Sequence, residues 1–487
     1  MENTVVRNQE PHILWNHFAD INAIPRASKK EDRIVEFMVT FGKNLGLETI
    51  VDPVGNVIIR KSASAGMENR KTVVLQSHLD MVHQKNSDTE FDFDNEGIKM
   101  YVDGDWVRAK GTTLGADNGL GVAAIMAYLE SDSLPHPAIE ALFTIDEETG
   151  MTGAEGLKAG SLTGNIMINL DTEEDDELTI GCAGGIDVTL LGEYAEEATP
   201  EGHQAYKLSV KGFKGGHSGM EIHLGLANAN KQMNRILFDL LGHGIRIASV
   251  DGGSLRNAIP RESFAVVTVP TAAQTDFENA FNAMGQIILK EHELTDPEGV
   301  ILFEKTDAPA KVMDTDSAKN LLLGIYACPN GIYRLTPKIE NLVQTSNNVA
   351  RVLIGDGKFT VMCLTRSSVD SEKEDLSRAI QAAFAITGAR VEFSGSYPGW
   401  SPRPTSDIVS MMSDLYKELF NEEAHVNSCH AGLECGILGR FYPDMEMISF
   451  GPRILGAHSP EERTQISSVQ KFWKFLNKTM EQIPLAK

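Results

Sequence analysis

The chain has 487 residues and a net charge of −24, with 42% hydrophobic and 23% charged residues. This acidic balance argues against nucleic-acid partners and anionic membranes, which both favour a basic surface. The first 25 residues include acids and lack the apolar segment of a signal peptide, and no run is long enough to span a membrane. With five scattered cysteines, these features predict a cytoplasmic protein with reduced thiols.

The first third of the chain alternates between helical and strand-like patterns. Apolar residues recur at helical spacing in 31–45 and 120–130, whereas 73–76, 139–145 and 165–170 are short apolar runs typical of buried strands. Strands that alternate with helices predict an α/β fold with a mostly parallel sheet.

The pattern changes between residues 187 and 398. Two successive segments each follow the order strand, helix, strand, strand, helix, strand, which is the ferredoxin-like arrangement. The first has strands near 205–211, 245–250, 263–269 and 299–304 and helices near 223–242 and 275–291. The second has helices near 315–327 and 372–387 and strands near 339–345, 358–365 and 389–395.

The α/β pattern returns after Pro398-Gly399-Trp400. Helices are predicted at 406–420, 432–440 and 465–484, and a strand at 445–450. We therefore predict one discontinuous α/β domain, 1–186 and 399–487, interrupted by an inserted α+β domain, 187–398, which is doubled.

Acids and histidines follow the predicted strands of the α/β domain. They comprise His78 and Asp80 after VVLQS, Glu147 and Glu148 after LFTID, Asp171 after IMINL, His458 after MISFG, and Asp117 between a glycine-rich turn and a helix. Sites in open α/β sheets lie beyond the carboxyl ends of strands, so these side chains are expected to converge.

Two histidines with three carboxylates suit zinc or another divalent first-row metal. Five ligands exceed the needs of one catalytic zinc, but they suit two ions that share a bridging carboxylate. A carboxylate left over from this set is then free to act as a base. Taken singly, His78 also fits an ordinary buried histidine and Asp117 a helix cap. The adjacent Glu147 and Glu148 are harder to explain without a metal, because buried carboxylates need partners.

Six segments in order resemble a known family. SHLDMV, GTTLGADNGLGVAA, TIDEETGMTGA, NLDTEE, GGHSG and GAHSPEE are similar to the motifs of the co-catalytic zinc peptidases that include carboxypeptidase G, succinyl-diaminopimelate desuccinylase and carnosinase. The resemblance covers nearly the whole chain. Within the family, LGADNGLG and DEETGMTGA are most similar to the bacterial aminoacyl-histidine (Xaa-His) dipeptidases.

The resemblance assigns roles that spacing alone leaves open. It implies that His78 and Asp171 bind one metal, that Glu148 and His458 bind the other, and that Asp117 bridges them. It also implies that Glu147 is the general base and that Asp80 orients His78. The ions are expected to be Zn2+, with Co2+ or Mn2+ as substitutes. Many members have Asp-Asp where this chain has Asp117-Asn118, and a cis peptide is expected at that bond.

In the inserted domain, the resemblance implies a lid that closes over the substrate. His217 matches the histidine that polarises the scissile carbonyl, and Asn257 and Arg366 match residues that hold the substrate and its carboxylate. Two of these residues also have structural alternatives. Arg366 could form a surface ion pair, and His217 could cap a loop. A homodimer is expected. A doubled lid leaves open whether His217 acts in its own site or in its partner's.

The resemblance predicts hydrolysis of dipeptides, with a preference for Xaa-His substrates such as carnosine, by a water activated between two metals. The alternatives are an amidohydrolase or deacylase of N-acyl amino acids, a broad-specificity dipeptidase, and a non-catalytic metal-binding protein, which would have no need of the base Glu147.

Overall fold

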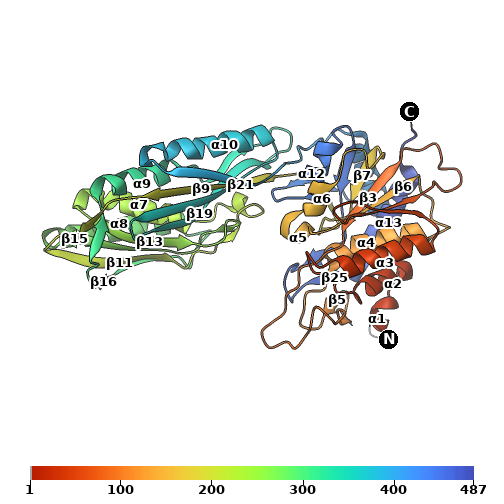
Figure 1. The fold of residues 1–487 in the computed structure, drawn as a ribbon, viewed down its shortest axis with the longest axis horizontal. Coiled ribbons are helices and arrows are strands. Elements are labelled where there is room, and N and C mark those ends of the chain that lie inside the picture. The colour runs from red at the N-terminus through yellow and green to blue at the C-terminus, as the bar shows by residue number, and fades with distance from the viewer. Residues whose placement is uncertain (1–2, 487) are drawn as a thin grey trace. The chain divides into compact units, whose positions relative to one another are not determined.

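The computed structural model describes residues 3–486, which fold as two compact units (Figure 1). The first unit comprises the chain up to Gly181, Pro402–Ser428 and the chain from Leu433 onward. The second comprises Cys182–Ser401 and the short segment Cys429–Gly432, which the sequence analysis placed in the other domain. Among the described residues, no helix is both long and apolar enough to cross a membrane.

The first unit is built around an eight-stranded mixed sheet. Its order is β1 (Glu48–Val51), β2 (Val57–Lys61), β6 (Ile139–Thr144), β3 (Val73–His78), β7 (Ile166–Asn169), β23 (Glu446–Ser449), β8 (Glu177–Cys182) and β22 (His425–Cys429). The four inner strands β6, β3, β7 and β23 are parallel. Their carboxyl ends therefore meet at one edge, as the sequence predicted.

The first unit also contains helices, several of which contact this sheet. The longest buried one is α4 (Ala116–Glu130), which contacts β3 and is almost entirely inaccessible to solvent. Such a helix is apolar all round because it has no solvent-facing side. The others are α1 (Thr4–Arg7), α2 (His12–Ile21), α3 (Asp32–Asn44), α5 (Glu147–Gly150), α6 (Thr152–Gly156), α11 (Asp407–Phe420), α12 (Glu434–Phe441) and α13 (Ile466–Gln482).

A smaller antiparallel sheet joins distant parts of the first unit. Its order is β24 (Ile454–Leu455), β25 (Arg463–Gln465), β5 (Trp106–Ala109) and β4 (Met100–Asp103). This sheet ties the loop that carries His458 to the segment that leads into α4.

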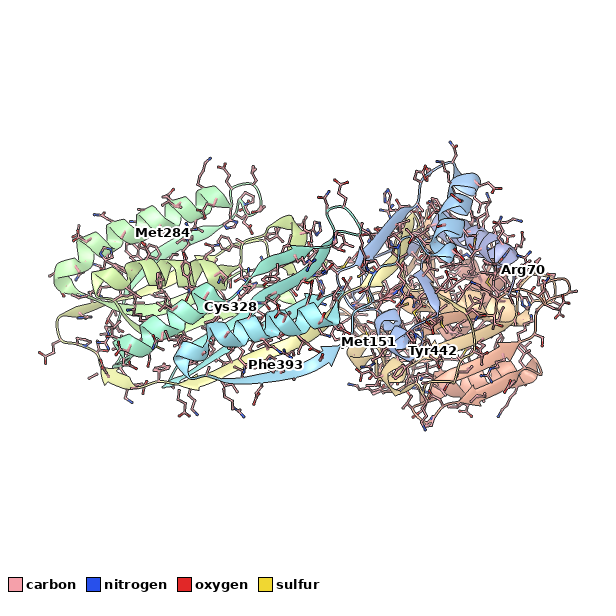
Figure 2. The ribbon with its side chains drawn as sticks, turned by 90° about the horizontal axis from the view of Figure 1, so that it is seen from above. Arg70, Met151, Met284, Cys328, Phe393 and Tyr442 are labelled. Atoms are coloured by element: carbon pink, nitrogen blue, oxygen red, sulfur yellow. The ribbon has the colours of Figure 1, made fainter. Side chains whose placement is uncertain are left out.

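The second unit has a nine-stranded antiparallel sheet. Eight strands follow the order β16 (Val300–Thr306), β11 (His203–Lys211), β15 (Ser263–Pro270), β13 (Arg246–Gly253), β19 (Val343–Gly355), β20 (Lys358–Ser367), β9 (Gly184–Glu193) and β21 (Arg390–Tyr397), and β18 (Gly331–Leu335) pairs with β19. Helices lie against one face of it (Figures 1 and 2). They are α7 (Ala229–Leu240), α8 (Gln274–Glu291), α9 (Thr315–Ala327) and α10 (Asp370–Ala383).

The strand order has the predicted doubled ferredoxin-like pattern. Strands β11, β13, β15 and β16 with α7 and α8 form one half, and β9, β19, β20 and β21 with α9 and α10 form the other. The halves are nested rather than successive, since β9 precedes the whole first half. The predicted mixed α/β fold is confirmed.

One predicted strand has wrong boundaries. The sequence analysis expected a strand at 339–345, but β19 begins at Val343 and continues to Gly355. Its first half contains Ser346, Asn347 and Asn348, which are polar yet buried. Because these polar residues interrupt the apolar pattern, the sequence did not reveal the full length of this central strand.

Candidate metal centre

His78 ends β3 and is almost fully buried. Its Nδ1 atom lies 3.1 Å from the Asp80 carbonyl oxygen and 3.4 Å from Asp80 Oδ1. These contacts fix the ring and direct Nε2 toward other carboxylates. A partner of this kind, which orients a histidine from its far nitrogen, is typical of metal sites.

Asp80 also holds the two adjacent glutamates. Its Oδ1 accepts a hydrogen bond from the Glu147 amide at 3.0 Å, and its Oδ2 accepts one from the Glu148 amide at 3.2 Å. Ser28 Oγ donates to Oδ2 at 2.7 Å. One buried carboxylate therefore positions both His78 and the backbone of the glutamate pair.

The glutamates, which the sequence places after a predicted strand, lie in the first turn of α5. Strand β6 stops at Thr144, and Asp146 turns the chain with a φ of 54°. The Asp146 side chain stabilises this turn by accepting hydrogen bonds from Thr149 and, at 2.7 Å, Thr152. The short helix ends at Gly150, and the residue after it, Met151, is labelled in Figure 2.

Asp117 lies between two histidines. Its Oδ1 is 3.1 Å from His78 Nε2, and its Oδ2 is 3.2 Å from His458 Nε2. The peptide between Asp117 and Asn118 is cis, as the sequence analysis expected. Each oxygen of this carboxylate thus faces a different histidine.

Two further carboxylates complete the cluster. Asp171 Oδ1 lies 3.4 Å from His78 Nε2, and Glu148 Oε2 lies 2.9 Å from His458 Nε2. Ligand atoms of His78, Asp117 and Glu148 all lie within 4.8 Å of one another. All seven residues predicted for this site in the α/β domain are therefore near one another at the carboxyl edge of the sheet.

The clustered carboxylates favour a positive charge on the histidines beside them. Hydrogen bonds with Asp117 and Glu148 raise the pKa of His458 to about 11. Burial by itself lowers the pKa of His78, but the nearby Asp171 and Asp117 carboxylates raise it well above its usual value. Burial also raises the pKa of Glu147 well above its usual value, and neighbouring acids add to this effect.

These residues fit a pair of divalent cations. Imidazole nitrogens and carboxylate oxygens are the usual ligands of zinc and related metals. Glu148 Oε1 is buried and has no hydrogen-bond partner among the described residues, so it has the capacity to bind a further group. Two divalent ions would also balance the four carboxylates of Asp117, Glu147, Glu148 and Asp171.

The remaining predicted residues form a second group, inside the second unit. His217 is in β12 (Gly216–His217), which pairs with β14 (Ala258–Ile259), and Ser218 donates to the Asn257 carbonyl at 2.8 Å. Arg366 in β20 is buried and donates to Tyr397 Oη at 2.9 Å, while its Nε has no partner among the described residues. A Cβ atom on Gly219 would lie 3.1 Å from both His217 Cε1 and Arg366 Nε.

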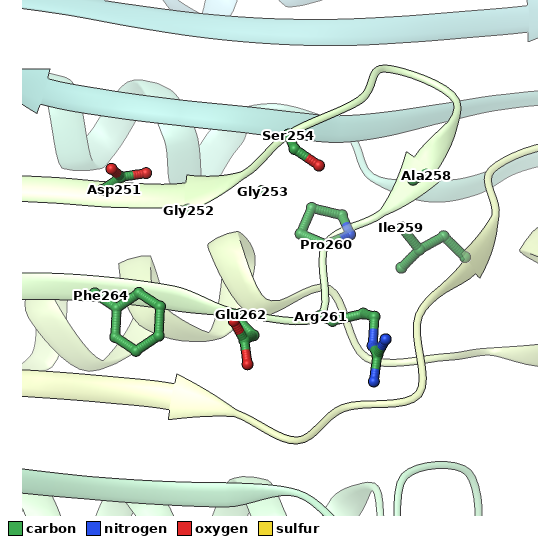
Figure 3. Close-up of a pocket in the computed structure, with 10 residues that line it drawn as sticks. All are labelled: Asp251, Gly252, Gly253, Ser254, Ala258, Ile259, Pro260, Arg261, Glu262 and Phe264. Carbon is green, nitrogen blue, oxygen red and sulfur yellow. The ribbon is translucent and has the colours of Figure 1, made fainter. Parts of the chain in front are cut away.

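A hollow of about 520 Å³ lies elsewhere in the second unit (Figure 3). It is lined mainly by the chain between β13 and β15, including Gly252, Ala258 and Pro260. None of the ten predicted site residues lines it, and we assign it no role.

A fully buried acid near the cluster was not predicted from the sequence. Glu434, the first residue of α12, accepts hydrogen bonds from Gln76 Nε2 and Thr144 Oγ1, each at 2.6 Å. Asn169 in turn donates to Gln76 Oε1 at 2.5 Å. The available signal was Gln76 itself, because a polar residue inside an apolar strand needs a buried partner.

Known proteins give an independent comparison. The model of Peptidase family M20/M25/M40 matches residues 74–482. The chain is 42% identical over 478 residues to the cytosol non-specific dipeptidase of Escherichia coli (strain K12), covering 97% of this chain and 98% of that protein.

Solved structures agree with this comparison. The aminoacylhistidine dipeptidase of Vibrio alginolyticus shares 42% identity and superimposes with a TM-score of 0.93, with 99% of each chain covered. An aminopeptidase from Bacillus cereus has a TM-score of 0.56 at 15% identity, covering 98% of this chain and 99% of that one, which shows a shared fold only. The family match and the high identity along almost the whole chain show that this protein belongs to Peptidase family M20/M25/M40 and is a metal-dependent peptide-bond hydrolase.

Proposed function

We propose that this protein is a dipeptidase that prefers substrates ending in histidine, such as carnosine, and that it acts at a centre of two metal ions. The position of Asp117 carries the proposal: its two oxygens lie 3.1 Å and 3.2 Å from nitrogens of two different histidines. A carboxylate in this position suits a bridge between two ions. Two relatives whose names denote dipeptidases support the substrate class.

In this proposal, His78 and Asp171 hold one ion, Glu148 and His458 hold the other, and Asp117 holds both. Zn2+ suits this donor set best, with Co2+ or Mn2+ as substitutes. When bound, the ions supply Lewis acidity, which polarises a carbonyl group and lowers the pKa of water.

Glu147 is the proposed general base. Its amide is fixed by Asp80 Oδ1 at 3.0 Å, whereas no described residue donates a hydrogen bond to its carboxylate. Burial raises the pKa of Glu147, which suits a group that must hold a proton between two steps. Glu147 takes a proton from the attacking water and later delivers it to the leaving amine.

His217 is proposed to stabilise the developing oxyanion. Its Nδ1 accepts hydrogen bonds from the amides of Gly219 and Met220, at 3.1 Å and 2.9 Å. Burial, together with the charge of Arg366, lowers the pKa of His217 to about 4, so the ring is neutral near pH 7. Its one hydrogen is therefore on Nε2, which makes Nε2 a donor to a carbonyl oxygen.

Asn257 and Arg366 are proposed to hold the substrate and its C-terminal carboxylate. Arg366 is buried and forms no ion pair within the described residues, and its Nε lacks a partner. A buried guanidinium of this kind needs an anion, and a carboxylate matches its planar, two-pronged shape. The second unit would then act as a lid that excludes water from the reaction.

A substrate panel tests the proposal. The metal-loaded protein would be assayed on Xaa-His dipeptides, on dipeptides with other C-terminal residues and on N-acyl amino acids. We expect the highest kcat/KM on Xaa-His dipeptides. Equal rates on all dipeptides would favour the broad specificity that the name of the Escherichia coli relative describes. Hydrolysis of N-acyl amino acids alone would contradict the proposal and favour a deacylase.

We further propose a cytoplasmic homodimer, the location being supported by the name of the Escherichia coli relative. Mixing His217→Ala and Glu147→Ala subunits, each inactive alone, tests where His217 acts. Activity that returns on mixing would show that His217 serves the partner's site. A mixture that stays inactive would place His217 in its own site.

A further inference from the structure

We infer that Glu462 and Arg26 are positioning residues that hold the Asp117 loop ready for metal binding. This inference rests on the metal centre proposed above. Neither residue is a ligand, and they come from opposite ends of the chain. Both are buried, and both bind backbone atoms of the segments that carry the proposed ligands.

Glu462 binds four consecutive amides at the start of α4. Its Oε2 accepts from Leu114 and Gly115 at 2.7 Å and 3.0 Å, and its Oε1 accepts from Ala116 and Asp117 at 2.8 Å and 3.3 Å. The first amides of a helix have no partner inside the helix. Gly115 at the N-cap has no side chain to offer them, so Glu462 supplies the cap from a distant segment.

Glu462 also links two proposed ligands. It lies four residues after His458, in a turn where the Glu462 amide donates to the Ser459 carbonyl at 3.0 Å. One short loop thus carries the proposed ligand His458 and the Glu462 carboxylate, which accepts hydrogen bonds from the loop of Asp117. This arrangement fixes the approach of His458 Nε2 to Asp117 Oδ2, which are 3.2 Å apart.

Arg26 holds the same loop through its carbonyl groups. Its Nη2 donates to Gly115 O at 2.7 Å, and its Nη1 donates to the carbonyls of Leu79 and Asp80 at 3.0 Å and 3.1 Å. Asn22 adds a bond from Nδ2 to Leu114 O at 3.0 Å. Arg26 therefore ties the loop of Asp117 to the segment that follows His78.

The fit around Arg26 leaves no room for change at Gly115. A Cβ atom on Gly115 would lie 2.5 Å from Arg26 Nη2, and Gly115 has a φ of +70°. The loop is therefore held on both sides, by a carboxylate on its amides and by a guanidinium on its carbonyls. Partners that orient metal ligands in this way typically contribute about 10- to 100-fold to metal affinity.

The test is the affinity of the full-length, metal-free protein for Co2+, measured by titration without substrate. We expect Glu462→Gln to bind Co2+ about 10- to 100-fold more weakly and to change the visible absorption spectrum of the bound ion. Glu462→Asp, whose shorter arm cannot reach all four amides, should lose less. Arg26→Lys keeps the charge but loses the separate donors Nη1 and Nη2, so it should also weaken Co2+ binding. This variant provides the test if Glu462→Gln does not fold.

Glu140 provides a matched control. It is also a buried carboxylate that accepts from backbone amides, those of Thr163 at 2.7 Å and Gly164 at 2.9 Å, but it lies on β6 away from that strand's carboxyl end. Glu140→Gln should lower the Tm while leaving Co2+ affinity and spectrum unchanged. If Glu462→Gln and Arg26→Lys both keep the wild-type Co2+ affinity and spectrum, the positioning role is overturned while the metal centre stands. An equal loss of Co2+ affinity in Glu140→Gln would overturn the positioning role as well. Failure of the unaltered protein to bind Co2+ would overturn the metal centre as well.

Discussion

The single carboxylate of Asp80 contacts three neighbouring residues. It contacts the far nitrogen of His78 and accepts the amides of Glu147 and Glu148. We predict that Asp80→Ala lowers kcat and weakens metal binding by about 10- to 100-fold. The reason is that the proposed ligand His78 and the backbone of the proposed base Glu147 both lose a hydrogen-bond partner. Activity assays with metal titration would measure both effects.

Asp52 is a control for that variant. Its Oδ1 accepts the amides of Val54, Gly55 and Asn56 at 3.0, 2.9 and 2.9 Å in a turn between β1 and β2. Asp52→Ala should lower the Tm without changing metal affinity. An Asp80→Ala protein that behaves like Asp52→Ala would contradict the role given to Asp80.

At the residue scale, the sequence predicted which side chains would gather at the site but not how each is held. His78, Asp171 and His458 were found because each follows an apolar strand, where parallel strands bring side chains together. The order of Glu147 and Glu148 came from resemblance, since adjacent acids have the same chemistry. Arg26 could not be found, because most of its partners are backbone carbonyls, which carry no sequence signal.

At the element scale, strands β3, β6 and β7 are joined below the metal centre through Glu434. Burial raises the pKa of Glu434 to about 8, so the folded chain favours its protonated form. The stability that this form contributes is complete below the usual pKa of a glutamate, and it is lost as the pH rises through about 8.

We therefore predict that Glu434→Gln, which imitates the neutral acid, gains stability relative to the wild type as the pH rises. The Tm of each metal-free protein, measured from about pH 5 to about pH 9, gives this difference directly. A difference in Tm that does not change over this range would show that Glu434 does not titrate as described.

Elements were predicted where their pattern was apolar and regular. The helix at 31–45 and the strand at 445–450 correspond to α3 and β23, whose buried residues follow the expected spacing. The turn at Asp146 before α5 was not predicted, because a non-glycine residue with positive φ is uncommon. The continuation of β19 through its buried polar residues 346–348 was missed for the reason given above.

At the scale of the whole molecule, metal binding should stabilise the fold. The carboxylates of the three proposed acidic ligands repel one another when no cation separates them. A ligand that binds only the folded state stabilises it by about 2.7 kcal/mol at 100 times its Kd. We predict that a chelator lowers the Tm and that added Zn2+ restores it. Calorimetry with and without chelator would test this, and equal Tm values would contradict it.

The discontinuous domain followed from the return of the α/β pattern after residue 398. The nesting of β9 ahead of the first ferredoxin-like half did not, because one strand before an insertion has the same local pattern as any other. The return of Cys429–Gly432 to the second unit is likewise set by tertiary packing, and four residues carry no pattern of their own.

The central claim is that two adjacent glutamates have different tasks, and a paired measurement tests it. Metal content and turnover of a Xaa-His dipeptide would be measured for Glu147→Ala and Glu148→Ala. We predict that Glu147→Ala retains two metal ions per chain but loses nearly all turnover, whereas Glu148→Ala loses one ion. Wild-type turnover in Glu147→Ala, or loss of metal from it, would contradict the account.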